Sequence, residues 1–253
     1  MNIYGIKDSA NFTLKYKTGA KKGKVYLYAD YATVSTNEWS SDQVYAKSKT
    51  VNAIRWDYNR NSTLKVDMEI FDLKWMAMCF GTEFVKGDKD ILKREVLTVS
   101  GGKATMSGTA ITGSLAVYTL DDDGLTNIQE LTVGTPASTE DTYSISDKEI
   151  TVNTALNGKK IAVFYLEKKT GVQTLTIDAD KYPENFEIVA DTLIRSTDGN
   201  DQFVQINYLN VKPKSQFTLT MDAANITTLS AEFDVLKDSA SSDMATYTIY
   251  QDE

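Results

Sequence analysis

The chain has 253 residues, of which 42% are hydrophobic, so it can bury a substantial core as one large or two modest domains. Its net charge of −8 argues against gripping nucleic acid through phosphate neutralisation, and neither a secretory signal nor an apolar run of roughly 18 residues, the length that spans a bilayer, is present. With no histidine, a single cysteine (Cys79) and no phosphate-binding glycine loop, the usual nucleophile triads and zinc or iron–sulfur sites are excluded, so we predict no enzyme, no cofactor and no metal.

The first distinctive segment, residues 39–58, carries four large aromatic side chains among Ser, Asn, Asp and Lys and shows poor strand alternation. We interpret it as a polar loop. Its aromatic residues fit three roles: a lid over the core, a self-association surface, or a platform for sugars or bases. The aromatic residues are Trp39, Tyr45, Trp56 and Tyr58.

The next segment begins with a strand and changes to a helix. Leu64, Val66, Met68 and Ile70 alternate with polar residues, which predicts a strand with one buried face. Downstream, the apolar spacing becomes i, i+3, i+4, i+7, which predicts one short helix near 72–80 with Asp72 as N-cap and Gly81 just beyond its end. We expect this helix to pack against a sheet or a neighbouring subunit, or to be an ordinary core helix, through Leu73, Met76, Ala77 and Phe80.

The middle of the chain, residues 95–180, has a different texture. Its short apolar runs predict strands at 96–98, 104–106, 115–120, 143–145, 149–152 and 161–166. Turn signals include Lys-Gly-Asp at 86–88, Asp-Asp-Asp-Gly at 121–124 and Asn-Gly at 157–158. We interpret 95–180 as an inserted small β-sandwich, which divides the remaining domain into 1–94 and 181–253.

The C-terminal part returns to clear alternation. Strands are predicted at 204–208, 217–221, 229–235 and 246–250, with an Asp-Gly turn at 198–199. The predicted fold class is therefore all-β, with a β-sandwich or barrel domain, one short α-helix and the inserted domain.

Two regions of the chain have a distinctive order of elements and residues. The stretch Asn59–Gly81 shows an alternating strand that runs straight into a short helix ending in glycine. The second region includes Tyr182-Pro183-Glu184-Asn185-Phe186, the run Val189–Arg195 and Val211-Lys212-Pro213-Lys214. Both regions resemble phage tail tube (major tail) proteins. The resemblance covers both flanks of the chain, and the middle looks like the added immunoglobulin-like domain that some of these proteins carry.

The resemblance implies a virion structural protein that assembles with itself into six-membered rings, which stack into a tail tube for genome ejection. Its partners would be other copies and other tail proteins, DNA would pass through without specific binding, and synthesis would occur in the host bacterial cytoplasm. Under this interpretation, residues 35–62 would form the ring-stacking loop, with large aromatic and arginine side chains at the contact. These residues are Trp39, Tyr45, Arg55, Trp56, Tyr58 and Arg60.

Two other functions are compatible with the same sequence. A phage capsid or capsid-decoration protein would also be β-rich and self-associating. A carbohydrate-binding or adhesin module would use the aromatic segment at 39–58 as a sugar platform.

Overall fold

The computed structural model describes residues 3–6, 8–70, 72–121, 123–137, 141–216, 223–224 and 226–251. Within these ranges the chain is mostly strand, which confirms the all-β fold class. Two compact units form, one from residues 1–84 and 175–253 and the other from residues 85–174. The predicted strand at 217–221 lies outside the described residues.

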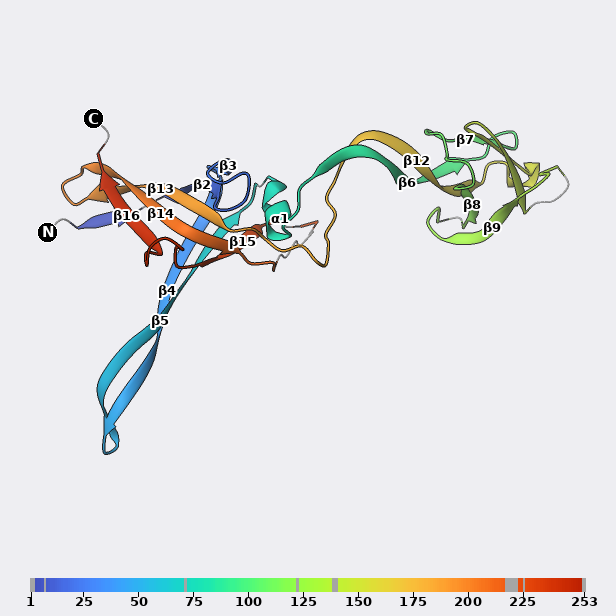
Figure 1. The fold of residues 1–253 in the computed structure, drawn as a ribbon. Helices are drawn as coiled ribbons and strands as arrows, with labels where there is room; N and C mark the ends of the chain where they lie inside the picture. Colours follow the sequence, from blue (N-terminus) through green and yellow to red (C-terminus); the bar gives the residue numbers. More distant parts are fainter. Residues whose placement is uncertain are drawn as a thin grey trace. The chain divides into compact units, whose positions relative to one another are not determined.

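The first unit is built on a nine-stranded sheet whose main path runs β3-β2-β13-β14-β15-β5-β4 (Figure 1). β1 extends the pairing along β13, and β16 pairs with the first half of β14 while β15 pairs with the second half. The elements are β1 (Tyr4–Ile6), β2 (Asn11–Tyr16), β3 (Val25–Ala29), β4 (Ala32–Ser48), β5 (Val51–Met68), α1 (Lys74–Cys79), β13 (Phe186–Ser196), β14 (Asp201–Pro213), β15 (Leu229–Val235) and β16 (Ala245–Tyr250).

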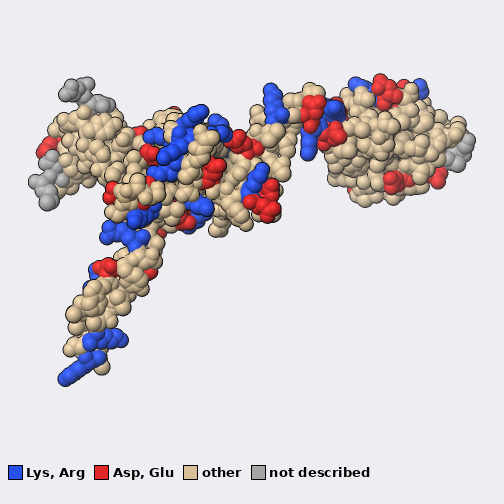
Figure 2. Space-filling view, in the orientation of Figure 1, with Lys and Arg blue, Asp and Glu red and all other residues tan. Residues whose placement is uncertain are grey.

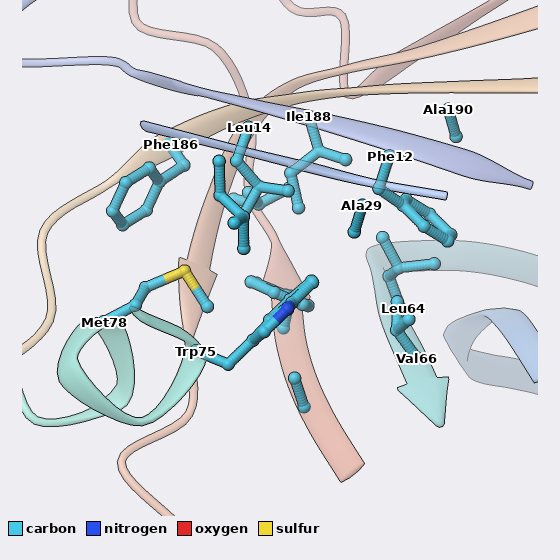
Figure 3. Close-up of a cluster of buried hydrophobic side chains, with 14 of the residues drawn as sticks. Phe12, Leu14, Ala29, Leu64, Val66, Trp75, Met78, Phe186, Ile188 and Ala190 are labelled. Atoms are coloured by element: carbon cyan, nitrogen blue, oxygen red, sulfur yellow. The ribbon is translucent and has the colours of Figure 1, made fainter. Parts of the chain in front are cut away.

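Helix α1 packs on the apolar face of this sheet. Trp75 is fully buried, and its indole N–H donates a 3.0 Å hydrogen bond to the Tyr31 hydroxyl. Figure 3 shows Trp75 and Met78 pointing from α1 toward Leu14 and Ile188 of the sheet. Because truncating a buried tryptophan typically costs about 3–5 kcal/mol, Trp75 is a main contributor to this core.

The predicted packing face of the helix was wrong in part. Leu73 is 47% exposed, and Met76 and Phe80 are only partly buried, although Ala77 is buried. The core contacts come instead from Trp75, Met78 and Cys79. The N-cap is Leu73 rather than Asp72, but the Asp72 carboxylate still accepts a 2.9 Å hydrogen bond from the Lys74 N–H.

Gly81 follows the helix, as predicted, and lies at the place where the two regions that carry the family resemblance come into contact. Its φ is +61°, and a Cβ built there would lie 2.1 Å from the Tyr182 carbonyl oxygen. The backbone of the segment before β13 therefore passes directly against the end of α1. Only glycine satisfies both the left-handed conformation and this close approach.

Replacing Gly81 by alanine should therefore destabilise the first unit strongly, by about 3 kcal/mol or more, because the added methyl group must displace backbone atoms. Gly19 is the matched control: its φ is +73°, but nothing lies within 4 Å of the place that an alanine methyl group would take. Gly19→Ala should cost only the conformational penalty of about 1–2 kcal/mol. Chemical denaturation of both variants measures the difference, and equal losses would contradict the steric account.

The second unit is a seven-stranded sheet in the order β6-β12-β8-β9-β10-β11-β7, with β9 and β10 parallel. Its own core contains Val117, Ile150, Ile161, Val163 and Tyr165, all essentially inaccessible. The elements are β6 (Val85–Thr98), β7 (Lys103–Thr105), β8 (Ala116–Leu120), β9 (Asn127–Val133), β10 (Thr142–Ser146), β11 (Glu149–Val152), the 3-10 turn η1 (Thr154–Leu156) and β12 (Lys160–Thr174). The immunoglobulin-like interpretation of this unit stays a prediction.

The long pair β6 and β12 corrects one turn prediction. Lys-Gly-Asp at 86–88 is not a turn but lies inside β6, because Gly87 pairs with Val172 and Lys86 with Gln173 of β12. Pairing continues to Val85 and Thr174, so residues 85–94 belong to the second unit rather than to the flanking domain. At the other boundary, residues 175–180 belong to the first unit rather than to the predicted insertion.

The half-buried carboxylate of Glu95 fastens the loop after β7 to this unit. Glu95 accepts hydrogen bonds from the Ser107 N–H (2.9 Å), the Ser107 hydroxyl (2.6 Å) and the Tyr165 hydroxyl. Burial raises the pKa of Glu95, but these hydrogen bonds and the nearby Lys93 outweigh it and lower the pKa to about 2. Every hydrogen-bond donor to this carboxylate belongs to the second unit, so the cluster has a structural role.

Candidate functional site: the outer β4–β5 hairpin

The most unusual feature of the first unit is the length of β4 and β5. The C-terminal part of β5, Ser62–Met68, pairs with β15 as well as with β4. The N-terminal part of β5, residues 51–61, pairs only with β4 among the described strands. The two strands leave the sheet as a two-stranded ribbon that ends in a tight turn at Lys49 and Thr50 (Figure 1). We call residues 42–60 the outer hairpin. The predicted polar loop at 39–58 was therefore wrong, because all of this segment except the turn at 49–50 lies in β4 and β5.

An irregularity marks the point where the outer hairpin begins. The register shifts between the pairs Ser40–Asn61 and Asp42–Tyr58, and Asn59 adopts a left-handed φ of +48°. The Asn59 side-chain amide donates a 2.8 Å hydrogen bond to Asp42, which holds the two strands together at this bulge. Bulges bend and twist a ribbon, so this one sets the direction in which the outer hairpin projects.

The outer hairpin has one apolar and one polar face. Because directly opposed residues share a face, the pairs Val44–Trp56 and Ala46–Ile54 lie on the same side, and alternation along β5 adds Tyr58. The other face carries the pairs Gln43–Asp57 and Tyr45–Arg55. Trp56 is 51% exposed, Ile54 54% and Tyr58 56%, so the apolar face is open to solvent.

Polar contacts fix the base of the hairpin. The Trp39 indole N–H donates a 2.6 Å hydrogen bond to the Asn37 side-chain oxygen, which also accepts from the Tyr247 hydroxyl at 3.1 Å. The Asn37 amide in turn donates to the buried Ser62 hydroxyl at 2.8 Å. Trp39 is therefore held in place although its side chain is 41% exposed.

A hollow of about 540 Å³ lies beside this base. Trp39, Tyr58 and Arg60 line it from the hairpin, and residues 242–245 line its other side. Arg60 makes no ion pair with any described residue. The hollow thus offers an aromatic surface and a guanidinium group at one place.

The six sequence-predicted residues fall into three positions on this one element. Trp39 and Arg60 lie at the base, Trp56 and Tyr58 on the apolar face, and Tyr45 and Arg55 on the polar face, where Arg55 pairs with Asp57 at 3.0 Å. Since all four aromatic residues are at least 40% exposed, they do not form a lid over the core. The assembly role of these residues stays a prediction.

Sequence reasoning missed the aliphatic members of the apolar face, Val44, Ala46 and Ile54. A signal was present in the β5 half, where Ile54, Trp56 and Tyr58 alternate with Arg55, Asp57 and Asn59. This pattern of period two is typical of a strand with one apolar face.

The outer hairpin supplies a surface for binding. An exposed apolar face on an element without a core is typical of a protein–protein contact. Among the described residues, no group of three or more His, Cys, Asp or Glu side chains could hold a metal ion. The described helices include none that is long and apolar enough to cross a membrane.

Similarity to known proteins extends over nearly the whole chain. Residues 4–249 match the YomU/Tube protein family. The chain belongs to that family. It is also 25% identical over 248 residues, 95% of this chain and 86% of the relative, to a protein named "Tail tube protein" from Bacillus phage SPR. The resemblance to phage tail tube proteins drawn from both flanks is thereby confirmed, and the family match extends across the middle unit as well.

Proposed function

We propose that this chain is the subunit of a bacteriophage tail tube, a non-enzymatic virion protein that forms hexameric rings stacked into a hollow conduit for genome ejection. The observation that carries the proposal is the outer hairpin, an exposed ribbon with an apolar face on a chain that belongs to the Tube family over nearly its whole length. In a monomer the apolar face of this ribbon stays exposed to solvent, whereas in stacked rings it can be buried against the adjacent ring.

The energetics favour assembly in which many hairpins bind together. Burying a large apolar side chain contributes about 2 kcal/mol, and the ordering of each subunit offsets much of this gain. One hairpin therefore binds weakly, while a complete ring presents several at once and gains from their combined binding. We expect stacking to be cooperative and to start slowly.

Part of the sheet of the first unit carries polar groups suited to a channel. On the side opposite the core, β2, β13, β14 and β16 carry Lys15, Glu187, Asp191, Gln205 and Thr248, and the same side carries Leu193, Phe203 and Tyr250 toward the C-terminal end of β13. Lys15 pairs with Glu187 at 3.3 Å, and the Gln205 amide donates to Asp191 at 2.9 Å. Since these charges are engaged within the sheet and the whole chain is acidic, a lumen lined by this face would let duplex DNA pass without binding it.

Electron microscopy of the purified protein tests the proposal. We expect hollow tubes with six-fold end views, and a lag before growth that shortens when tube fragments are added as seeds. If the particles in the micrographs are closed shells instead of tubes, the protein is a capsid protein. A protein that stays monomeric at high concentration in the presence of seeds would contradict the proposal.

A further inference from the structure

Charge is distributed unevenly along the β4–β5 hairpin. Residues 43–56 contain three of the 27 basic side chains of the chain and none of the 35 acidic ones. The remainder therefore carries 24 basic against 35 acidic side chains, a net charge of −11. The hairpin end is a cationic extension of an otherwise strongly acidic molecule.

The excess positive charge belongs to two lysines at the turn. Arg55 pairs with Asp57, whereas Lys47 and Lys49 are exposed and make no ion pair with any described residue. Figure 2 shows basic and no acidic side chains at the outer end of the hairpin. Lys49 is itself a turn residue and has a left-handed φ of +57°.

We propose that Lys47 and Lys49 guide the hairpin end onto an acidic surface of a second copy of this chain. This inference rests on the proposed function and specifies how the hairpin finds its site. The first unit offers acidic groups in the segment before β13, where Asp178, Asp180 and Glu184 are exposed and make no ion pair with any described residue. They outnumber the one exposed basic side chain among them, Lys181. Opposite charges on approaching surfaces accelerate encounter and select orientation, while the apolar face supplies the lasting contact.

A purely protective role for the lysines makes a different prediction. Lysines on exposed strands prevent edge-to-edge aggregation, and for that purpose any like charge on all hairpins suffices. Glutamates at the same positions would repel one another equally well. Reversing the charge therefore separates attraction to an acidic partner from simple repulsion between hairpins.

The experiment compares wild type, Lys47→Glu/Lys49→Glu and the conservative Lys47→Arg/Lys49→Arg in seeded tube growth, with fold checked by circular dichroism. We expect growth of the glutamate variant to be slower by about tenfold or more at low salt, and the gap to narrow as salt rises, because screening removes the attraction. The arginine variant should grow like wild type.

The outcomes separate this inference from the function on which it rests. If wild-type tubes form and the glutamate variant grows equally fast at low salt, the charge guidance is wrong and the tube proposal stands. If, in addition to this equal growth, wild-type protein binds duplex DNA and the glutamate variant does not, the lysines bind nucleic acid instead of a second copy of the chain. If wild type forms no tubes at all, the failure lies with the proposed function.

Discussion

Replacing both Trp39 and Trp56 by alanine should abolish tube formation and leave the fold intact. Trp56 lies at the centre of the apolar face, opposite Val44, and Trp39 lies at the hairpin base beside the hollow. Their side chains are 51% and 41% exposed in the free subunit, so their loss removes little of the core. At an interface, each large aromatic truncation costs about 2 kcal/mol or more, and the loss is repeated at every subunit of a ring.

Two control variants separate a loss of stacking from a loss of fold. Leu125→Ala with Val133→Ala removes two side chains of the second unit that are 73% and 75% exposed, and should leave tubes unchanged. Trp75→Ala removes a fully buried ring and should weaken the fold itself, which near-ultraviolet circular dichroism would report. Normal tubes from the Trp39/Trp56 variant would rule out a stacking role for these aromatic side chains.

Removing the second unit should leave assembly possible. Val85 and Thr174 are paired, so Phe84 and Leu175 lie at adjacent chain ends and a short glycine-serine link can replace residues 85–174. The second unit has its own core, and the first unit keeps its sheet, helix and hairpin. We therefore expect the shortened chain to fold and to form tubes that lack only the density of the second unit.

Electron microscopy and circular dichroism of the shortened chain measure this. A shortened protein that is soluble and folded but never assembles, even with wild-type seeds, would show that the second unit contributes to the tube wall itself.

Strands with one buried face could be predicted from the sequence. The alternation at 229–235 matches β15 residue for residue, and Leu64, Val66 and Met68 line the core face of β5. In these strands burial selects one face, so polar and apolar residues must alternate. The same physics explains the short strands of the second unit.

The β4 half of the outer hairpin could not be predicted in the same way, because it has no buried face in the subunit. It mixes Ser, Asp and Gln with Val and Tyr, and the bulge near Ser41 breaks the period. Only pairing with β5 makes the segment a strand, and the side chains of its apolar face do not belong to the core of the first unit. Pairing with β12 likewise decides the conformation of Lys-Gly-Asp at 86–88, which locally favours a turn.

The helix shows a limit of periodicity in short elements. Trp75, Met78 and Cys79 follow the i, i+3, i+4 spacing as well as the predicted set does. Over a six-residue helix the two sets compete, and the sheet below selects the face that carries the largest side chain. Burial of Trp75 thus decides what spacing alone left open.

A helical reconstruction of wild-type tubes, at a resolution that separates strands, tests most directly whether the outer hairpin joins one ring to the next. We predict that density for residues 42–60 crosses from its own ring onto a subunit of the adjacent ring, with the face carrying Ile54, Trp56 and Tyr58 buried there. Density showing the hairpin confined to its own ring, or projecting into solvent with that face uncovered, would contradict it.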